Sequence, residues 1–252
     1  MRRIAVTIDA LEISAQALEQ AVRLAERLGA QLEGIFVEDI DLIAISELPF
    51  LREVRTVSRS ESAISLPRME QELRALARRA ERLLGEQASR YNVAWSFRIW
   101  RGSIDADLLE ANIEADVLAL SRLGAALRRR QVTRSRTTAV TVLYSGSEAS
   151  VRALDTAISL AGDPGRELYI VLSAEDESEA ARLHQQAMEQ LHSVGANAHF
   201  VRPADGALSD LIEILSDTNT SVLVVERGNK VLLTPSLKQS LNKLNCPLLI
   251  VR

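Results

Sequence analysis

The sequence predicts an α/β protein made of two tandem modules, each an open parallel sheet with helices on both faces. The first observation behind this prediction is an internal repeat. Residues 4–25 align without a gap with residues 140–161, and eight of the 22 aligned positions are identical; such self-similarity indicates a duplicated module. The second is the alternation of short apolar runs with helical patterns, which is typical of β-α-β units and a parallel sheet. Right-handed crossovers then place helices on both faces.

Each copy begins with a strand that leads into an amphipathic helix. Residues 3–8 are rich in β-branched side chains and alternate in polarity, and Asp9 follows at the carboxyl end of this strand. In the next helix, apolar residues recur at spacings of three and four, which forms one apolar stripe. The stripe consists of Ala15, Leu18, Val22 and Ala25 in the first copy and of Val151, Leu154, Ile158 and Ala161 in the second. Gly29 and Gly162 stand where glycine commonly ends a helix.

The later elements also occur in pairs. We expect second strands at residues 31–37 and 167–172, third strands at 95–100 and 198–202, and fourth strands at 117–120 and 222–225. A long helix lies between the second and third strands of each copy. It begins at Pro67 in the first copy, because proline suits a first helical turn, and its second-copy stripe is Leu183, Ala187, Leu191 and Val194. A shorter helix, containing residues 107–110 or 210–213, precedes each fourth strand.

The copies differ in their middle and at their ends. The offset between them falls from 136 to 103 by the third strand, so the first copy has about 33 extra residues, around 38–66. Their apolar part, residues 42–51, is expected to cover a cleft or join a dimer interface, and residues 55–65 are expected to be mobile. After its fourth strand only the second copy has room for another helix (235–244) and a fifth strand (247–251). We therefore predict a first module, residues 1–136, truncated after its fourth strand, and a second module, residues 137–252.

Composition narrows the function class. Hydrophobic residues make up 47% of the 252 residues and charged residues 25%, which is ordinary for a globular protein. The net charge of −4 favours no nucleic acid partner. No apolar stretch approaches the length of a membrane span, and the apolar run at the N-terminus is too short for a secretion signal. We therefore expect a cytoplasmic protein that does not bind membranes.

The order of these elements, together with four motifs, resembles the universal stress protein family in its tandem form. The motifs are the opening residues 4–9, the loop and helix start at residues 145–154, the fourth strand with its flanks at 115–122, and the closing residues 246–252. The resemblance covers nearly the whole chain. It implies five-stranded parallel sheets, a role in stress response, and dimerisation through the last strand.

The resemblance also implies where a nucleotide would bind. Many members of the family bind ATP or a related nucleotide through an acidic residue after the first strand and a glycine motif after the fourth. Carried over to this chain, these positions are Asp9, Val37, Ser121, Arg122 and Gly124 in the first module, and Ser145, Arg227 and Gly228 in the second.

Both copies depart from the nucleotide motif. Ser145 replaces the acidic residue in the second copy, and each copy keeps a single glycine, Gly124 or Gly228, after its fourth strand. Glycines allow successive backbone N–H groups to converge on phosphate oxygens. We therefore expect degenerate nucleotide sites and no cofactor, with ATP or AMP as the alternative.

Two features of the first module have more than one interpretation. Asp9 is either a ligand group at the carboxyl end of a parallel strand or a carboxylate stabilised by the dipole of the next helix. Six arginines, beginning at Arg122, lie within residues 122–136, and no acidic residue occurs between Asp116 and Glu148. This segment is a residual anion site, a contact for RNA or an acidic partner, or a solvated linker between the modules. The segment has no aromatic residue, which argues against base stacking.

Neither a catalytic nor a metal site is predicted. His184, His192 and His199 lack metal-site spacing and are expected to be exposed to solvent. The sequence has no P-loop, no dinucleotide-binding glycine motif and no nucleophile elbow. The single cysteine, Cys246, is expected to be a buried, unreactive thiol.

The sequence therefore favours a non-catalytic stress-response protein that acts as a regulatory or interaction module. Its two halves are expected to form an intramolecular pseudo-dimer with degenerate nucleotide sites, and the chain is expected to form a homodimer or bind an unidentified protein partner. The alternative is a small-molecule binding protein that holds an adenine nucleotide or another anion in a cleft at Asp9 and Arg122. A slow ATPase is a third hypothesis, which the missing phosphate loop disfavours.

Overall fold

The computed structural model describes residues 3–9, 15–38, 52–54, 61–63, 66–102, 115–120, 138–162, 165–203, 208–230 and 246–252. In the first half of the chain the elements are β1 (Arg3–Asp9), α1 (Ala15–Arg27), β2 (Gln31–Glu38), β3 (Arg52–Val54), β4 (Glu61–Ala63), α3 (Leu66–Arg90), β5 (Trp95–Arg101) and β6 (Val117–Leu120). In the second half they are β7 (Thr138–Tyr144), α6 (Glu148–Ala161), β8 (Arg166–Leu172), α7 (Glu177–Val194), β9 (His199–Val201), α8 (Leu208–Asp217), β10 (Thr220–Glu226) and β11 (Leu248–Val251).

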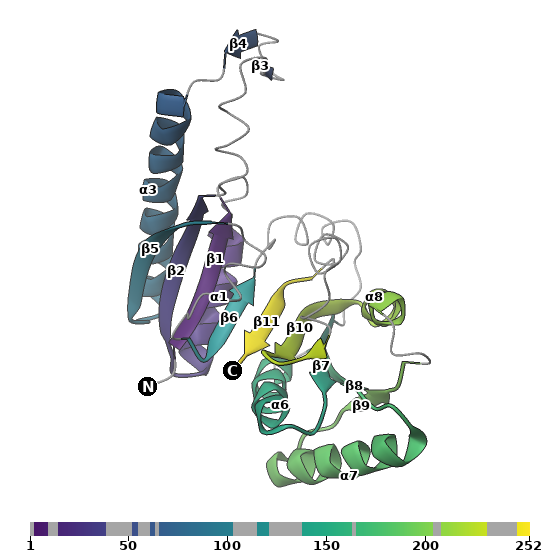
Figure 1. Ribbon diagram of the computed structural model, residues 1–252. Coiled ribbons are helices and arrows are strands. Elements are labelled where there is room, and N and C mark those ends of the chain that lie inside the picture. Colours follow the sequence, from purple (N-terminus) through teal and green to yellow (C-terminus); the bar gives the residue numbers. More distant parts are fainter. Residues whose placement is uncertain are drawn as a thin grey trace.

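One open sheet runs through both halves of the molecule (Figure 1). Its nine strands lie in the order β5-β2-β1-β6-β11-β10-β7-β8-β9. Neighbouring strands are parallel everywhere except at β6 and β11, which pair antiparallel with Leu120 opposite Leu248. The predicted parallel arrangement is therefore confirmed within each half. The two halves, however, share one continuous sheet rather than forming two separate ones.

The strand order is the same when it is read outward from β11 in either direction. On one side lie β6, β1, β2 and β5, and on the other β10, β7, β8 and β9. These are the fourth, first, second and third strands of each module, so β7 occupies the place in the second module that β1 occupies in the first. The predicted repeat is confirmed. In the described residues the truncated first module contributes four strands to this sheet, and β11 of the second module takes the fifth position beside β6.

Helices cover both faces of the sheet. Helices α1, α3, α6 and α7 pack on one face, against strand residues such as Ile4 and Val6 of β1 and Val140 and Val142 of β7. Helix α8 packs on the other face, where Leu211 and Leu215 meet a second core. Because successive strand residues point to opposite faces, strands buried on both faces must be apolar almost throughout. This requirement explains runs such as Thr138–Tyr144, in which all residues after the first are buried.

The predicted apolar stripes account for the helix packing. In α1, Leu18, Val22 and Ala25 are buried. In α7, Leu183, Ala187 and Leu191 are buried, but Val194 is 55% exposed. It is the last residue of the helix, next to the αL residue Gly195 at which the chain leaves the helical path. The other end of α7 is capped by Asp176, whose carboxylate accepts a hydrogen bond from the backbone N of Glu179 at 2.8 Å.

Asp116 ties the two ends of the described chain together. Its carboxylate accepts a hydrogen bond from the backbone N of Arg3 at 2.8 Å, and its own backbone N donates to the Arg3 carbonyl at 2.9 Å. Its carbonyl accepts from the backbone N of Arg252 at 2.9 Å. Arg152 of α6 donates to the carbonyl of Arg252 at 2.8 Å. The end of β11 is thus bonded to both modules.

One local prediction needs correction, and another is confirmed with a different backbone conformation. Cys246 is half-buried rather than fully buried, because it lies before β11 at the margin of the second core. Gly162 caps α6 as predicted, but with φ of −61° rather than a left-handed conformation, and its N–H donates to the carbonyl of Ile158.

Some predictions fall wholly or partly outside the described residues. The apolar part of the insertion (residues 42–51) and the helices expected at 107–110 and 235–244 lie outside them. Of residues 55–65, only 61–63 are described, as strand β4. It pairs antiparallel with β3, and Figure 1 shows this pair beyond the end of α3. Among the described helices, none combines the length and apolar character needed to cross a membrane.

Candidate functional site

Those predicted site residues that the structure describes lie at the carboxyl ends of the parallel strands. In the first module Asp9 ends β1 and is paired in register with Val37 of β2. In the second module Ser145 follows β7, and the neighbouring strand β10 ends at Glu226. Ligands of open α/β sheets bind at this edge, so these strand ends are the candidate site of each module.

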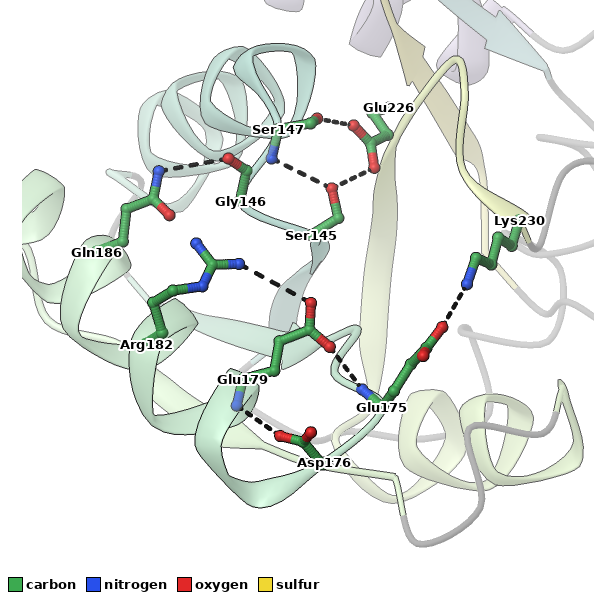
Figure 2. A network of polar contacts seen from close by, with 10 residues as sticks. All are labelled: Ser145, Gly146, Ser147, Glu175, Asp176, Glu179, Arg182, Gln186, Glu226 and Lys230. Atoms are coloured by element: carbon green, nitrogen blue, oxygen red, sulfur yellow. Dashed lines mark hydrogen bonds and ion pairs between the residues drawn. The ribbon is translucent and has the colours of Figure 1, made fainter.

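A buried carboxylate occupies the site of the second module. Glu226 is 6% exposed, and both of its carboxylate oxygens accept hydrogen bonds (Figure 2). The Ser145 hydroxyl donates to Oε1 at 2.6 Å, and the Ser147 hydroxyl donates to Oε2. The side-chain amide of Asn229 donates to Oε1 at 3.5 Å. Several donors therefore stabilise this charge away from water.

The same serines shape the start of α6. Ser147 is the N-cap of this helix, and its hydroxyl oxygen accepts a hydrogen bond from the backbone N of Ser150 at 3.0 Å. The backbone N of Ser147 donates to the Ser145 hydroxyl oxygen at 3.3 Å. The chain can make this turn because Gly146 has φ of +77°, which glycine adopts without strain. The two hydroxyls thus connect Glu226 to a helix N-terminus.

Helix α7 lies directly over this loop. A Cβ atom at Gly146 would be 2.5 Å from a methyl carbon of Leu183 and 2.9 Å from the amide oxygen of Gln186. The Gln186 amide nitrogen donates to the Gly146 carbonyl at 3.4 Å. The space above the first loop of this module is therefore filled by side chains of the chain itself.

Ion pairs join the loops around α7 to the turn after β10. The Lys230 ammonium donates to the Glu175 carboxylate at 2.8 Å, and this pair lowers the pKa of Glu175 and raises the pKa of Lys230. Glu179 accepts from the backbone N of Glu175 at 2.8 Å and lies 3.8 Å from Arg182. Figure 2 shows these contacts beside the Glu226 cluster. Both side chains of the Lys230–Glu175 pair are exposed, so solvent screens their attraction.

The turn after β10 has its backbone groups engaged. The backbone N of Arg227 donates to the Val251 carbonyl at 2.8 Å, which continues the pairing with β11. The backbone N of Asn229 donates to the Glu226 carbonyl at 3.1 Å, and Gly228 is exposed between them. The predicted residues Arg227 and Gly228 therefore lie at the site. However, the backbone N–H groups of Arg227 and Asn229, which would have to point at a bound phosphate, are already bonded within the protein.

The first module has a different arrangement next to Asp9. Val37 is 1% exposed, and the following residue, Glu38, is also buried. The Glu38 carboxylate accepts a hydrogen bond from Arg101 Nε, at the end of β5, at 2.6 Å; this bond raises the pKa of Arg101. The backbone N of Gly102 donates to the Glu38 carbonyl at 3.2 Å. Ser121, Arg122 and Gly124, predicted for the same site, lie outside the described residues, as does the whole arginine-rich segment (residues 122–136).

Sequence reasoning missed Glu226, although the repeat contains a signal for it. Asp9 aligns with Ser145 at the end of the first strand, and Ser121 aligns with Glu226 at the end of the fourth. The acidic residue and the serine have therefore exchanged strands between the copies. Comparing both positions together, rather than the first strand alone, would have pointed to the acidic residue of the second site.

The three histidines contact aromatic rings or the backbone. His184 packs against Phe200 with ring centroids 4.1 Å apart, and His199 stacks on Tyr169 at 4.8 Å. His192 contacts the Met188 carbonyl at 2.8 Å. All three are exposed, as predicted, on α7 and β9. Within the part of the chain that the structure describes, no cluster of three metal-ligating side chains occurs.

Comparison with known proteins supports the resemblance at the level of fold. A universal stress protein from Archaeoglobus fulgidus DSM 4304 superposes with a TM-score of 0.58 at 12% sequence identity, and the match covers 98% of this chain and 96% of that one. The chain has the universal stress protein fold. Because the match spans both chains almost completely, it includes the tandem arrangement as well as the single module.

Shorter universal stress protein structures match about half of the chain. One is a universal stress protein in complex with cAMP, with a TM-score of 0.37, 19% identity, and coverage of 47% of this chain and 99% of that one. Another is the universal stress protein from Archaeoglobus fulgidus in complex with dAMP, with a TM-score of 0.38, 17% identity, and coverage of 46% and 98%. No protein-family model matches the sequence. No curated protein matches it either.

Proposed function

We propose that this chain is a non-catalytic stress-response protein that acts as a regulatory or interaction module and whose nucleotide sites have degenerated. The observation that carries the proposal is the Glu226 carboxylate, buried at the end of β10 between the hydroxyls of Ser145 and Ser147. In the universal stress protein fold this edge of the sheet is the ligand edge. A protein carboxylate fills it here.

The charge of Glu226 opposes binding of phosphate. Two like charges about 4 Å apart repel each other by about 4 kcal/mol at the effective dielectric constant typical near a protein surface. A nucleotide phosphate placed beside the Glu226 carboxylate would meet this repulsion. The backbone N–H groups of Arg227 and Asn229, which are bonded within the protein, do not compensate for it.

The packing of α7 opposes binding of a nucleoside. Leu183 and Gln186 lie against Gly146, so a ring system at this loop would have to displace α7. Leu183 is fully buried in the main core, and moving it would expose that apolar side chain to water. Burying a leucine side chain stabilises a protein by about 1.5–3 kcal/mol, so the displacement would cost a nucleoside much of its binding energy.

The hydroxyls of Ser145 and Ser147 are placed for structure rather than for catalysis. Each donates its proton to a carboxylate, and Ser147 also caps α6. The three histidines lie elsewhere on the surface, so within the described residues no imidazole is positioned to activate either serine as a nucleophile. This supports a protein that acts by contact with a partner.

A nucleotide-binding assay tests the proposal. A ligand at 100 times its dissociation constant stabilises a protein by about 2.7 kcal/mol, which raises the melting temperature of a chain of this size by roughly 5–10 °C. We expect millimolar Mg-ATP to shift the melting temperature no more than pyrophosphate of equal charge does. We also expect no nucleotide among the small molecules released when the purified protein is denatured, as measured by mass spectrometry.

A second candidate function is binding of an adenine nucleotide or another anion by the first module. Asp9 and Val37 lie in register at adjacent strand ends, and the exposed guanidinium of Arg101 lies on the next strand. The Asp9→Ala variant separates the two candidates. An ATP-specific rise in melting temperature that disappears in Asp9→Ala would replace the first proposal with this one.

A further inference from the structure

The outer edge of β5 is the longer of the two end edges of the sheet. The end strands are β5, with seven residues, and β9, with three. Every β5 residue pairs with a residue of β2 on the inner side. Among the described residues no strand pairs with the outer side. A strand edge of this length presents N–H and C=O groups that template the addition of another strand.

Apolar side chains are exposed along the same edge. Three large apolar residues in the described part of the chain are exposed, and two of them are Trp95 and Ile99 of β5, at 37% and 50%. Residues two apart on a strand point to one face, so Trp95, Phe97 and Ile99 share a face. This is the face covered by α3, because the Trp95 ring lies 2.7 Å from where a Cβ of Gly85 would be.

The opposite face of β5 carries Ser96, Arg98 and Trp100. Arg98 forms an ion pair with Glu33 of β2 at 3.0 Å, and its guanidinium lies 6.0 Å from the Trp100 ring centroid. The charge of Arg98 is therefore compensated within the module. It does not by itself prevent another strand from approaching.

We propose that β5 pairs antiparallel with β5 of a second copy of this chain, in a register centred on Phe97. In this register Phe97 faces Phe97, and each Trp95 faces Ile99 of the other copy. On the opposite face each Arg98 faces Ser96. The exposed apolar side chains of both copies then cover one another, and no two like charges are directly opposite. Cross-strand aromatic and aromatic–β-branched pairs stabilise a sheet.

The chosen register and occupant follow from the residues of the edge. A register centred one residue later would place Arg98 opposite Arg98, and like charges directly opposite destabilise a sheet. The register centred on Phe97 avoids this repulsion and also places both exposed apolar residues, Trp95 and Ile99, opposite each other. The inner edges of the two modules are not available to a second copy, because β11 is already paired with β6 and with β10.

The oligomeric state of the full chain tests the proposal. In sedimentation analysis we expect a species with twice the 27.7 kDa chain mass. Ile99→Lys should shift it to the monomer, because a charge then replaces an apolar contact at the edge. Val194→Lys, which changes the third exposed apolar residue on α7, should leave the dimer intact. A wild-type chain that stays monomeric up to its solubility limit, an Ile99→Lys dimer, or monomers from both variants would overturn the proposal.

Cysteine cross-linking tests the register. Facing residues of an antiparallel pair have Cα atoms about 4.5–5.5 Å apart, within the range for a disulfide. With Cys246 replaced by serine, Phe97→Cys should form a disulfide-linked dimer under mild oxidation, whereas Ser96→Cys, which faces Arg98, should not. A cross-link through Ser96→Cys, or none through Phe97→Cys while the dimer persists, would contradict the register.

Discussion

At the scale of single residues, the exchange of an acid and a serine distinguishes the two modules. The first module has Asp9 at the end of its first strand, whereas the second has Ser145 there and Glu226 on the neighbouring strand. In the second module both carboxylate oxygens accept hydrogen bonds from the protein. A carboxylate held in this way acts as a structural acceptor. Both of its oxygens are engaged within the protein.

Replacing Glu226 should therefore destabilise the fold. Glu226→Gln keeps the shape but turns one acceptor into an amide donor facing a serine hydroxyl, which leaves a buried group unsatisfied. We expect the free energy of unfolding to fall by about 1–3 kcal/mol in urea denaturation. Glu175→Gln, at an exposed ion pair, should change it much less, because solvent screens the attraction between the two charges. Equal effects of the two substitutions would show that Glu226 is not a structural acceptor.

Tyr144 allows a test that depends on pH. Its hydroxyl is buried and has no hydrogen-bond partner among the described residues, and burial raises the pKa of the phenol above 10.0. At pH values between 10.0 and the raised pKa, the folded protein therefore keeps the phenol proton, whereas the unfolded chain has released it. The Tyr144 contribution to stability is full below pH 10 and is lost as the pH rises above 10.

We expect Tyr144→Phe to unfold at the same urea concentration as the wild type at neutral pH, or a higher one, since it removes an unsatisfied group worth about 1–3 kcal/mol. Above pH 10 the variant should lose less stability than the wild type. A steeper alkaline loss in Tyr144→Phe would contradict the burial of an unpaired phenol.

At the scale of elements, the position of α7 closes the second site. The helix is set by Asp176 at its start and Gly195 at its end, and between them Leu183 and Gln186 rest on Gly146. The helix and the first loop of the module therefore depend on each other. A substitution in the loop should be transmitted to α7.

Two glycines with similar backbone angles provide a matched pair for this claim. Gly146 and Gly195 have φ of +77° and +66°, but a Cβ would meet Leu183 only at Gly146 and nothing within 4 Å at Gly195. Gly195→Ala should destabilise by about 1–2 kcal/mol through left-handed strain alone. Gly146→Ala should cost at least about 1 kcal/mol more through the clash. Chemical denaturation measures both, and equal losses would place α7 away from the loop.

At the scale of the whole molecule, a single strand joins the modules. Strand β11 is parallel to β10 and antiparallel to β6, so backbone hydrogen bonds make one continuous sheet across the two modules. The backbone of Arg252 also bonds to Asp116. Unfolding of either module would expose the edge of β11 that the module covers.

We therefore expect the two modules to unfold together. Both tryptophans lie on β5 of the first module, so their fluorescence reports that module, whereas far-UV circular dichroism reports both. The two signals should give the same midpoint in urea. Ile250→Asp, which places a charge in the buried strand β11, should separate the midpoints. Separate midpoints in the wild type would mean that β11 does not couple the modules.

The sequence by itself predicted the repeat, the order of strands and helices, and the truncation of the first module. Local patterns were sufficient because a strand buried on both faces must be apolar, and an amphipathic helix must repeat its apolar residues every three or four positions. The loss of the glycine motif could also be recognised in the sequence, because the local backbone conformation that binds phosphate requires glycine.

Only the tertiary structure determined which residues and strands are neighbours across the sheet. The contact between Ser145 and Glu226 joins residues 81 positions apart, and the sharing of β11 joins strands of different modules. Neither of these two contacts leaves a periodic pattern in the sequence. Residues on neighbouring strands are far apart in the sequence, and only the folding of the connections between strands brings them together. For the same reason the closure of the second site by α7 could be seen only in the folded chain. There, the side chains of Leu183 and Gln186 pack against Gly146, which has no side chain of its own.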